Sequence, residues 1–134
     1  AMQLAINEAG IELNQVDYIN THGTSTIIGD LAEVKAIQDL FAEHAYNISL
    51  TSSKSMTGHV LGATGAIEAI ISVLSMKHSM VTPTINHEKG DEDPNIDYKL
   101  NFTFNQAQPR EINYAMSNNF GFGGHNACLL FKRI

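Results

Sequence analysis

The sequence has a single cysteine, no excess of positive charge and no long apolar run. One cysteine, Cys128, excludes an internal disulfide framework and CxxC-type metal sites. The formal net charge of −6, without a dense Lys or Arg stretch, argues against nucleic acid or an acidic membrane surface as a partner. No apolar run reaches the roughly 18 residues of a membrane-spanning helix, and no signal-peptide pattern opens the chain. We therefore expect a globular chain that is located in the cytoplasm.

Strand and helix signals alternate along the sequence. The expected elements are a helix over 1–9, a strand over 16–20, a helix from 30 to about 44, a strand over 48–53, a helix over 63–78 and strands over 100–104, 112–118 and 126–134. This order predicts an α/β fold in which helices pack on a mixed five-stranded sheet. Residues 81–99, rich in Pro, Gly and acids, are expected to form a surface loop.

Two helix boundaries carry local signals. Gly10 is expected to end the first helix in a left-handed conformation. Asp30, three residues before Glu33, suggests a capping box at the start of the second helix. The first helix has no capping residue at its start, and we therefore expect residues 1–134 to be a single domain cut from a longer protein.

Glycine and histidine occur together in three stretches of the sequence. Eight of the ten glycines lie in these stretches, which also contain His22, His59 and His125. Each stretch follows an expected strand, and sites in open α/β sheets form at the carboxyl ends of strands. Glycines can also simply mark turns, which is the alternative for any one stretch. The repeated combination favours a functional site.

Glu68 is the one charged residue between Val60 and Met76, within a helix that is apolar on nearly every side. An unpaired buried carboxylate costs several kcal/mol or stays protonated. Lys54 is the natural partner, because only a short loop joins its strand end to this helix. We therefore predict a buried ion pair between Lys54 and Glu68, with a solvent-exposed Glu68 as the alternative.

The other potentially reactive residues show no pattern typical of a catalytic or metal site. Cys128 alternates with large apolar residues, which is typical of a buried strand thiol rather than a nucleophile. No HExxH or comparable spacing supports a metal site, and no GxSxG or phosphate-loop motif occurs.

Three ordered motifs together resemble a known family. They are "THGTST" with "GD" at 29–30, "SSKSMTGHVLGATGAIEA" at 52–69 and "SNNFGFGGHNA" at 117–127. The chain resembles the C-terminal part of the β-ketoacyl-[acyl carrier protein] synthases, specifically the synthase II type of fatty-acid synthesis, and would cover about the final third of such an enzyme. The resemblance implies a thiolase-like fold, in which two similar α/β halves stack as five layers, with residues 1–134 as most of the second half.

The resemblance also implies a decarboxylative Claisen condensation. An acyl group is loaded on a cysteine, malonyl-carrier protein loses CO2, and the resulting carbanion attacks the acyl thioester. His22 and His59 match the histidines that donate hydrogen bonds to the malonyl thioester oxygen, and both must be neutral to do so. Lys54 matches the family lysine and Glu68 its partner.

Further residues match substrate-binding positions of the family. Thr24 and Thr26 correspond to contacts for the phosphopantetheine arm. Phe122 corresponds to the aromatic residue that gates the acyl and malonyl pockets, with its backbone N–H in the oxyanion hole. The implied partners are acyl carrier protein bearing acyl and malonyl groups, the missing N-terminal half and a second subunit of a homodimer. No resident cofactor is implied, because the carrier protein brings the phosphopantetheine.

The sequence departs from the family pattern in two ways. Ile27 stands where the family usually has proline, and the family's nucleophilic cysteine belongs to an N-terminal part that is absent here. Cys128 does not match that cysteine, so we expect the isolated chain to be inactive. Two alternatives stay open: a chain-length-factor-like or inactive paralogue of the same fold, and a standalone binding module.

Overall fold

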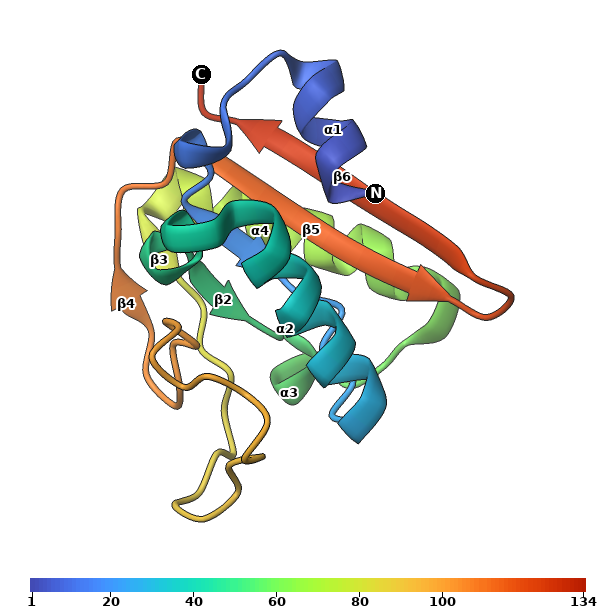
Figure 1. The fold of residues 1–134 in the computed structure, drawn as a ribbon. Helices are drawn as coiled ribbons and strands as arrows, with labels where there is room; N and C mark the ends of the chain where they lie inside the picture. The colour runs from blue at the N-terminus through green and yellow to red at the C-terminus, as the bar shows by residue number, and fades with distance from the viewer.

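A four-stranded mixed sheet forms the centre of the chain and has helices on both faces (Figure 1). The computed structural model describes residues 1–134. The strand order is β2-β1-β5-β6. These strands span Tyr18–Asn20 (β1), Ser49–Thr51 (β2), Tyr114–Gly121 (β5) and His125–Lys132 (β6). Strand β1 runs parallel to both β2 and β5, whereas β5 and β6 form an antiparallel hairpin.

Helices connect the parallel strands. The α-helices are α1 (Met2–Ala9), α2 (Ile27–Phe41), α3 (Lys54–Thr57) and α4 (Thr64–His78). Short 3-10 helices cover Leu13–Gln15 (η1), Ala42–Asn47 (η2) and Leu61–Ala63 (η3). A separate antiparallel pair joins β3 (Met80–Val81) to β4 (Gln108–Pro109). None of the helices is long and apolar enough to cross a membrane.

The two faces of the sheet bury two separate clusters of apolar side chains. Because side chains alternate along a strand, neighbouring residues point to opposite faces. Ile19 and Met116 belong to the cluster that includes buried residues of α1 and α2. Tyr18 and Ala115, one position earlier on each strand, belong to the cluster that includes Met76 of α4. The sheet is therefore held between α1 and α2 on one side and α4 on the other.

The expected fifth strand at 100–104 is absent from the main sheet, so the prediction of five strands was wrong. This segment makes only isolated bridges, Ser49 with Asn101 and Thr84 with Phe104. Thr103 has a φ of 42° and Asn105 a φ of 59°. Left-handed residues cannot continue an extended ladder, so the chain turns away after one bridge.

The boundaries of the helices confirm one local prediction and correct another. Gly10 ends α1 with a φ of 64°, as expected. The proposed capping box does not form: α2 begins at Ile27, before Asp30, and the side chain of Glu33 accepts hydrogen bonds from the backbone of His22 and Gly23 instead.

Helix α4 is buried on one side only. Glu68, Ser72 and Met76 are buried on the side that faces the sheet. On the other side Ile70 is 59% exposed and Val73 47% exposed. Helix α4 therefore carries apolar residues on a side that packing within this chain leaves exposed.

Ile37 and Ile70 provide a matched test of this arrangement. Ile37 has no exposed surface and lies in the core beneath α2. We expect Ile37→Ala to lower the free energy of unfolding by about 2–5 kcal/mol, because it removes buried methylene groups and leaves a cavity. Ile70→Ala, on the exposed side of α4, should change it by less than about 1 kcal/mol. Urea denaturation of the isolated chain measures both, and similar losses for the two variants would contradict the assigned burial.

Candidate active site

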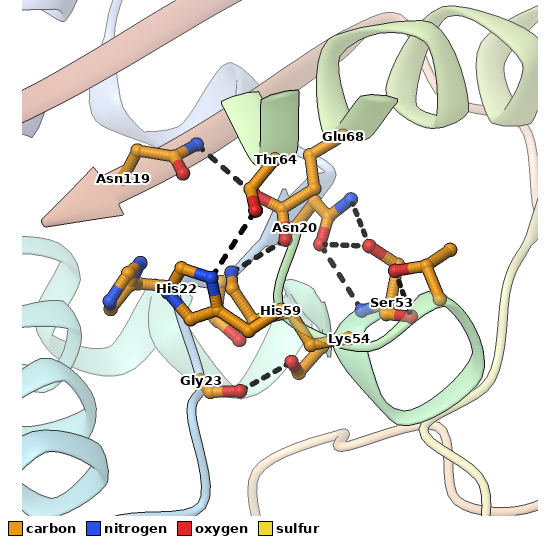
Figure 2. A network of polar contacts seen from close by, with 12 residues as sticks. Asn20, His22, Gly23, Ser53, Lys54, His59, Thr64, Glu68 and Asn119 are labelled. Carbon is orange, nitrogen blue, oxygen red and sulfur yellow. Dashed lines mark hydrogen bonds and ion pairs between the residues drawn. The ribbon is translucent and has the colours of Figure 1, made fainter. Parts of the chain in front are cut away.

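The carboxyl ends of β1, β2 and β5 bring the predicted site residues to one edge of the sheet (Figure 2). His22 follows β1, and Lys54 begins α3 directly after β2. His59 lies between α3 and α4. The ring centroids of His22 and His59 are 6.0 Å apart, with the ring planes at 89°. The two histidines, which the family resemblance assigns to one substrate oxygen, therefore lie close together.

Lys54 and Glu68 form the predicted buried ion pair. Lys54 Nζ donates to Glu68 Oε1 at 2.6 Å, and the two side chains are 5% and 1% exposed. Burial raises the pKa of Glu68, and the hydrogen bond and positive charge of Lys54 oppose that rise. The pair therefore satisfies a carboxylate that would otherwise be isolated beneath an apolar helix.

Backbone hydrogen bonds fix the tautomers of both histidines. Phe120 N–H donates to His22 Nδ1 at 3.2 Å, and Leu61 N–H donates to His59 Nδ1 at 3.1 Å. A neutral imidazole nitrogen that accepts a hydrogen bond carries no proton, so the proton of each ring is on Nε2. The site thus presents two Nε2–H donors. Thr64 Oγ1 lies 3.4 Å from His59 Nδ1 and adds a second polar contact there.

The surroundings of His22 hold its imidazole neutral. Burial is the largest cause, and the positive charge of Lys54 and the nearby His59 ring act in the same direction. Together they lower the pKa of His22 to about 4. His22 is therefore a neutral hydrogen-bond donor near pH 7.

Glu33 is a site residue that the sequence analysis missed. It is 4% exposed, and its two carboxylate oxygens accept the N–H groups of His22 at 2.9 Å and Gly23 at 3.0 Å. Burial raises the pKa of Glu33, and these hydrogen bonds oppose the rise. One signal was available: Glu33 occupies the same helical stripe as Ile37 and Phe41, at spacings of four, where a charge needs a partner.

A cavity of about 510 Å3 opens beside His59, and its lining includes Thr21 and Gly23 on either side of His22 but not His22 itself. Its lining also includes Thr24, Lys54 and His59, together with the aromatic residues Phe102 and Phe104. Thr24 Oγ1 lies 3.2 Å from Thr26 Oγ1. Thr26 itself is exposed at the N-cap of α2, so of the two threonines only Thr24 lines the cavity.

Phe122 does not reach the cavity in this chain. It lies in the turn between β5 and β6, and its side chain is fully exposed. Gly123 and Gly124, each with a φ of 82°, turn the chain there. Phe120 is the aromatic residue beside His22, with ring centroids 5.1 Å apart.

The remaining candidates take no part in this cluster. Cys128 packs against the core beneath α1 and α2, and burial raises the pKa of its thiol to about 11. The thiol is therefore protonated at neutral pH, which disfavours a nucleophilic role. His125 is exposed at the start of β6. No group of three or more His, Cys, Asp or Glu side chains is arranged to hold a metal ion.

Comparison with known proteins identifies the family to which this chain belongs. The family described as beta-ketoacyl synthase, C-terminal domain, matches residues 1–88. The chain is 55% identical over 134 residues to 3-oxoacyl-[acyl-carrier-protein] synthase 2 of Staphylococcus aureus (strain COL), covering 100% of this chain and 31% of that protein. It is 47% identical over 133 residues to the protein of the same name from Coxiella burnetii, covering 99% and 31%. The chain belongs to the beta-ketoacyl synthase family and corresponds to its C-terminal domain.

Solved structures share the fold. A beta-ketoacyl synthase from Burkholderia phymatum superposes with a TM-score of 0.89 and 40% identity, over 99% of this chain and 31% of that one. A ketosynthase of a type II polyketide synthase, solved in complex with its acyl-carrier protein, gives a TM-score of 0.92 and 34% identity, over 99% and 32%. The expected thiolase-like fold is confirmed. The chain spans about a third of the length of these relatives.

His22 provides a direct test of the electrostatics. We expect its imidazole to titrate near pH 4 in the folded chain, and near pH 6.5 in urea, where burial and neighbouring charges are lost. Because the unfolded state binds the proton first, the free energy of unfolding should fall as pH drops from about 6.5 to about 4. NMR titration of the His22 ring measures both midpoints. Coincident midpoints in folded and unfolded chains would rule out this account.

Glu33→Gln tests how the His22 loop is held. An amide places an N–H2 group against one of two backbone N–H donors, so one hydrogen bond is lost. We expect the free energy of unfolding to fall by about 1–3 kcal/mol. Glu43→Gln, at an exposed position, is the matched control and should change it by less than about 0.5 kcal/mol. Equal values for the two variants in urea denaturation would show that Glu33 is not needed there.

Proposed function

We propose that residues 1–134 form the C-terminal domain of a longer 3-oxoacyl-[acyl carrier protein] synthase, which elongates fatty acids by decarboxylative condensation. The observation that carries this proposal is the pair of Nε2–H donors on His22 and His59, each fixed by a backbone N–H at Nδ1. Two such donors on rings whose centroids lie 6.0 Å apart suit a carbonyl oxygen that becomes negatively charged. The names of the similar proteins point to the same reaction.

The two histidines act on the malonyl thioester. The bond between the malonyl carboxylate carbon and Cα breaks, CO2 leaves, and its electron pair forms an enolate whose charge lies on the thioester oxygen. His22 and His59 donate hydrogen bonds to that oxygen. The enolate carbon then attacks the acyl thioester carbonyl, and the cysteine thiolate leaves. That cysteine lies outside this chain, since the thiol of Cys128 has a pKa of about 11 and faces the core.

The substrates arrive on acyl carrier protein. One similar ketosynthase was solved in complex with its acyl-carrier protein, which supports the same class of partner here. Thr24 would contact the phosphopantetheine arm in the cavity, whereas Thr26 and Phe122 would contribute only when the rest of the protein surrounds them. The phosphopantetheine belongs to the carrier protein, so no resident cofactor is needed. A homodimer located in the cytoplasm completes the proposal.

A chain-length-factor-like or inactive subunit fits the site less well. Such a role would not require two histidines in a defined tautomer or a buried Lys54–Glu68 pair. His59 is exposed in this chain, and hydrogen bonds to a developing charge are stronger in a water-excluded site. The rest of the longer protein must therefore cover the site before it works at full rate.

The test is the decarboxylation of malonyl-carrier protein by the full-length protein. His22→Ala and His59→Ala should each lower kcat by about 100- to 1,000-fold, because each removes one donor to the enolate oxygen. His78→Ala, at the exposed end of α4, is the control and should stay within about twofold. The isolated chain should form no β-ketoacyl product, and turnover through acylated Cys128 would contradict the proposal.

A further inference from the structure

The Glu68 carboxylate has two oxygens, and Lys54 satisfies only one of them. Oε1 accepts from Lys54 Nζ at 2.6 Å, and Oε2 accepts from Asn119 Nδ2 at 3.1 Å (Figure 2). Glu68 has no exposed surface, so water cannot replace either donor. A buried carboxylate oxygen without a donor is strongly unfavourable, and the carboxylate would turn to find one. The amide of Asn119 therefore restricts the rotation of the group that holds Lys54.

The position of Asn119 is itself well determined. It pairs with Ala127 across the β5–β6 hairpin. Its amide also lies against the first turn of α4: a Cβ added to Gly65 would lie 3.6 Å from Asn119 Nδ2. The strand and the helix thus hold this amide from two directions.

Asn119 and Phe120 are consecutive residues near the carboxyl end of β5. Their side chains point to opposite faces of the sheet. Phe120 N–H fixes the tautomer of His22, while the Asn119 side chain reaches Glu68. One dipeptide therefore contacts both parts of the site, the histidine and the ion pair.

We propose that Asn119 is a positioning residue for the condensation reaction: its amide orients Glu68, and Glu68 in turn places the Lys54 ammonium in the cavity wall near the histidines. This inference rests on the proposed function. It assigns Asn119 no contact with substrate. Asn119 acts only through Glu68 and Lys54, so its loss should change turnover more than substrate binding.

A purely structural role would be a simple tie between β5 and α4. The two roles differ in what they predict when the donor and acceptor are exchanged. A tie contributes to stability through the hydrogen bond alone. A positioning role requires the atom beside Lys54 to remain an oxygen in the same place, with negative charge close by.

The test uses the full-length enzyme and the decarboxylation of malonyl-carrier protein. Asn119→Asp sets a second carboxylate against Glu68, and we expect kcat to fall by at least about tenfold, with KM changed by less than about threefold. Asn113→Ala, at an exposed position before β5, is the matched asparagine control and should stay within about twofold. A wild-type kcat for Asn119→Asp would overturn the proposal.

The exchange variant combines Asn119→Asp with Glu68→Gln. One amide and one carboxylate are still present, but with their positions exchanged: the glutamine oxygen faces Lys54 and its N–H2 group faces the new aspartate. We expect kcat to recover by about tenfold relative to Asn119→Asp alone. The single variant Glu68→Gln completes the comparison. If the fold-loss in kcat of the double variant equals the product of the fold-losses of Asn119→Asp and Glu68→Gln, the two residues act independently, and the proposal is overturned.

Crystal structures separate failure of this inference from failure of the proposed function. If the wild-type enzyme decarboxylates no malonyl thioester, the proposed function fails, but the positioning of Glu68 can still be judged. In Asn119→Ala we expect the Glu68 carboxylate to rotate and the contact between Lys54 Nζ and Glu68 Oε1 to lengthen beyond about 4 Å. An unchanged ion pair in that variant would overturn the role of Asn119. If Asn119→Ala does not fold, Asn119→Asp provides this readout, because the repulsion between the two carboxylates should also move Glu68 away from its present position.

Discussion

The buried ion pair between Lys54 and Glu68 is the interaction on which the site depends. It joins α3, which follows β2, to the second turn of α4, and so determines where the loop carrying His59 can lie. A buried pair adds little net stability compared with apolar side chains, yet removal of one partner leaves an uncompensated charge. Such an interaction is therefore weak evidence for stability, and its contribution here is the contact that it makes between α3 and α4.

Strand β5 provides the second constraint, because its carboxyl end serves both faces of the sheet. Parallel pairing with β1 brings Phe120 close to His22, and antiparallel pairing with β6 fixes the register of that end. A slip of one residue would reverse which side chains face α2 and which face α4. The strands that form the core are thus the same strands that set the tautomer of the histidine.

More of the site than of the fold could be predicted from the sequence. The lone charge of Glu68 in an apolar helix was enough to predict its pairing with Lys54, because burial of charge has few solutions. Segment 100–104 was wrongly predicted as a fifth strand, since the positive φ of Thr103 has no signature in an alternating apolar pattern. Glu33 was missed because a carboxylate near a helix start fits both a capping box and a support for a distant loop. Only the tertiary structure distinguishes these two roles of Glu33.

The protonation state of His22 depends on the other charged groups of the site. Glu68 allows Lys54 to remain charged although it is buried, because each compensates the other. The charge of Lys54, added to the larger effect of burial, lowers the pKa of His22 to about 4. A neutral His22 with Nδ1 occupied by Phe120 N–H has only Nε2–H to offer. The ion pair therefore helps to decide that the histidine donates a hydrogen bond rather than carrying a charge, which is the property that the proposed enolate stabilisation requires.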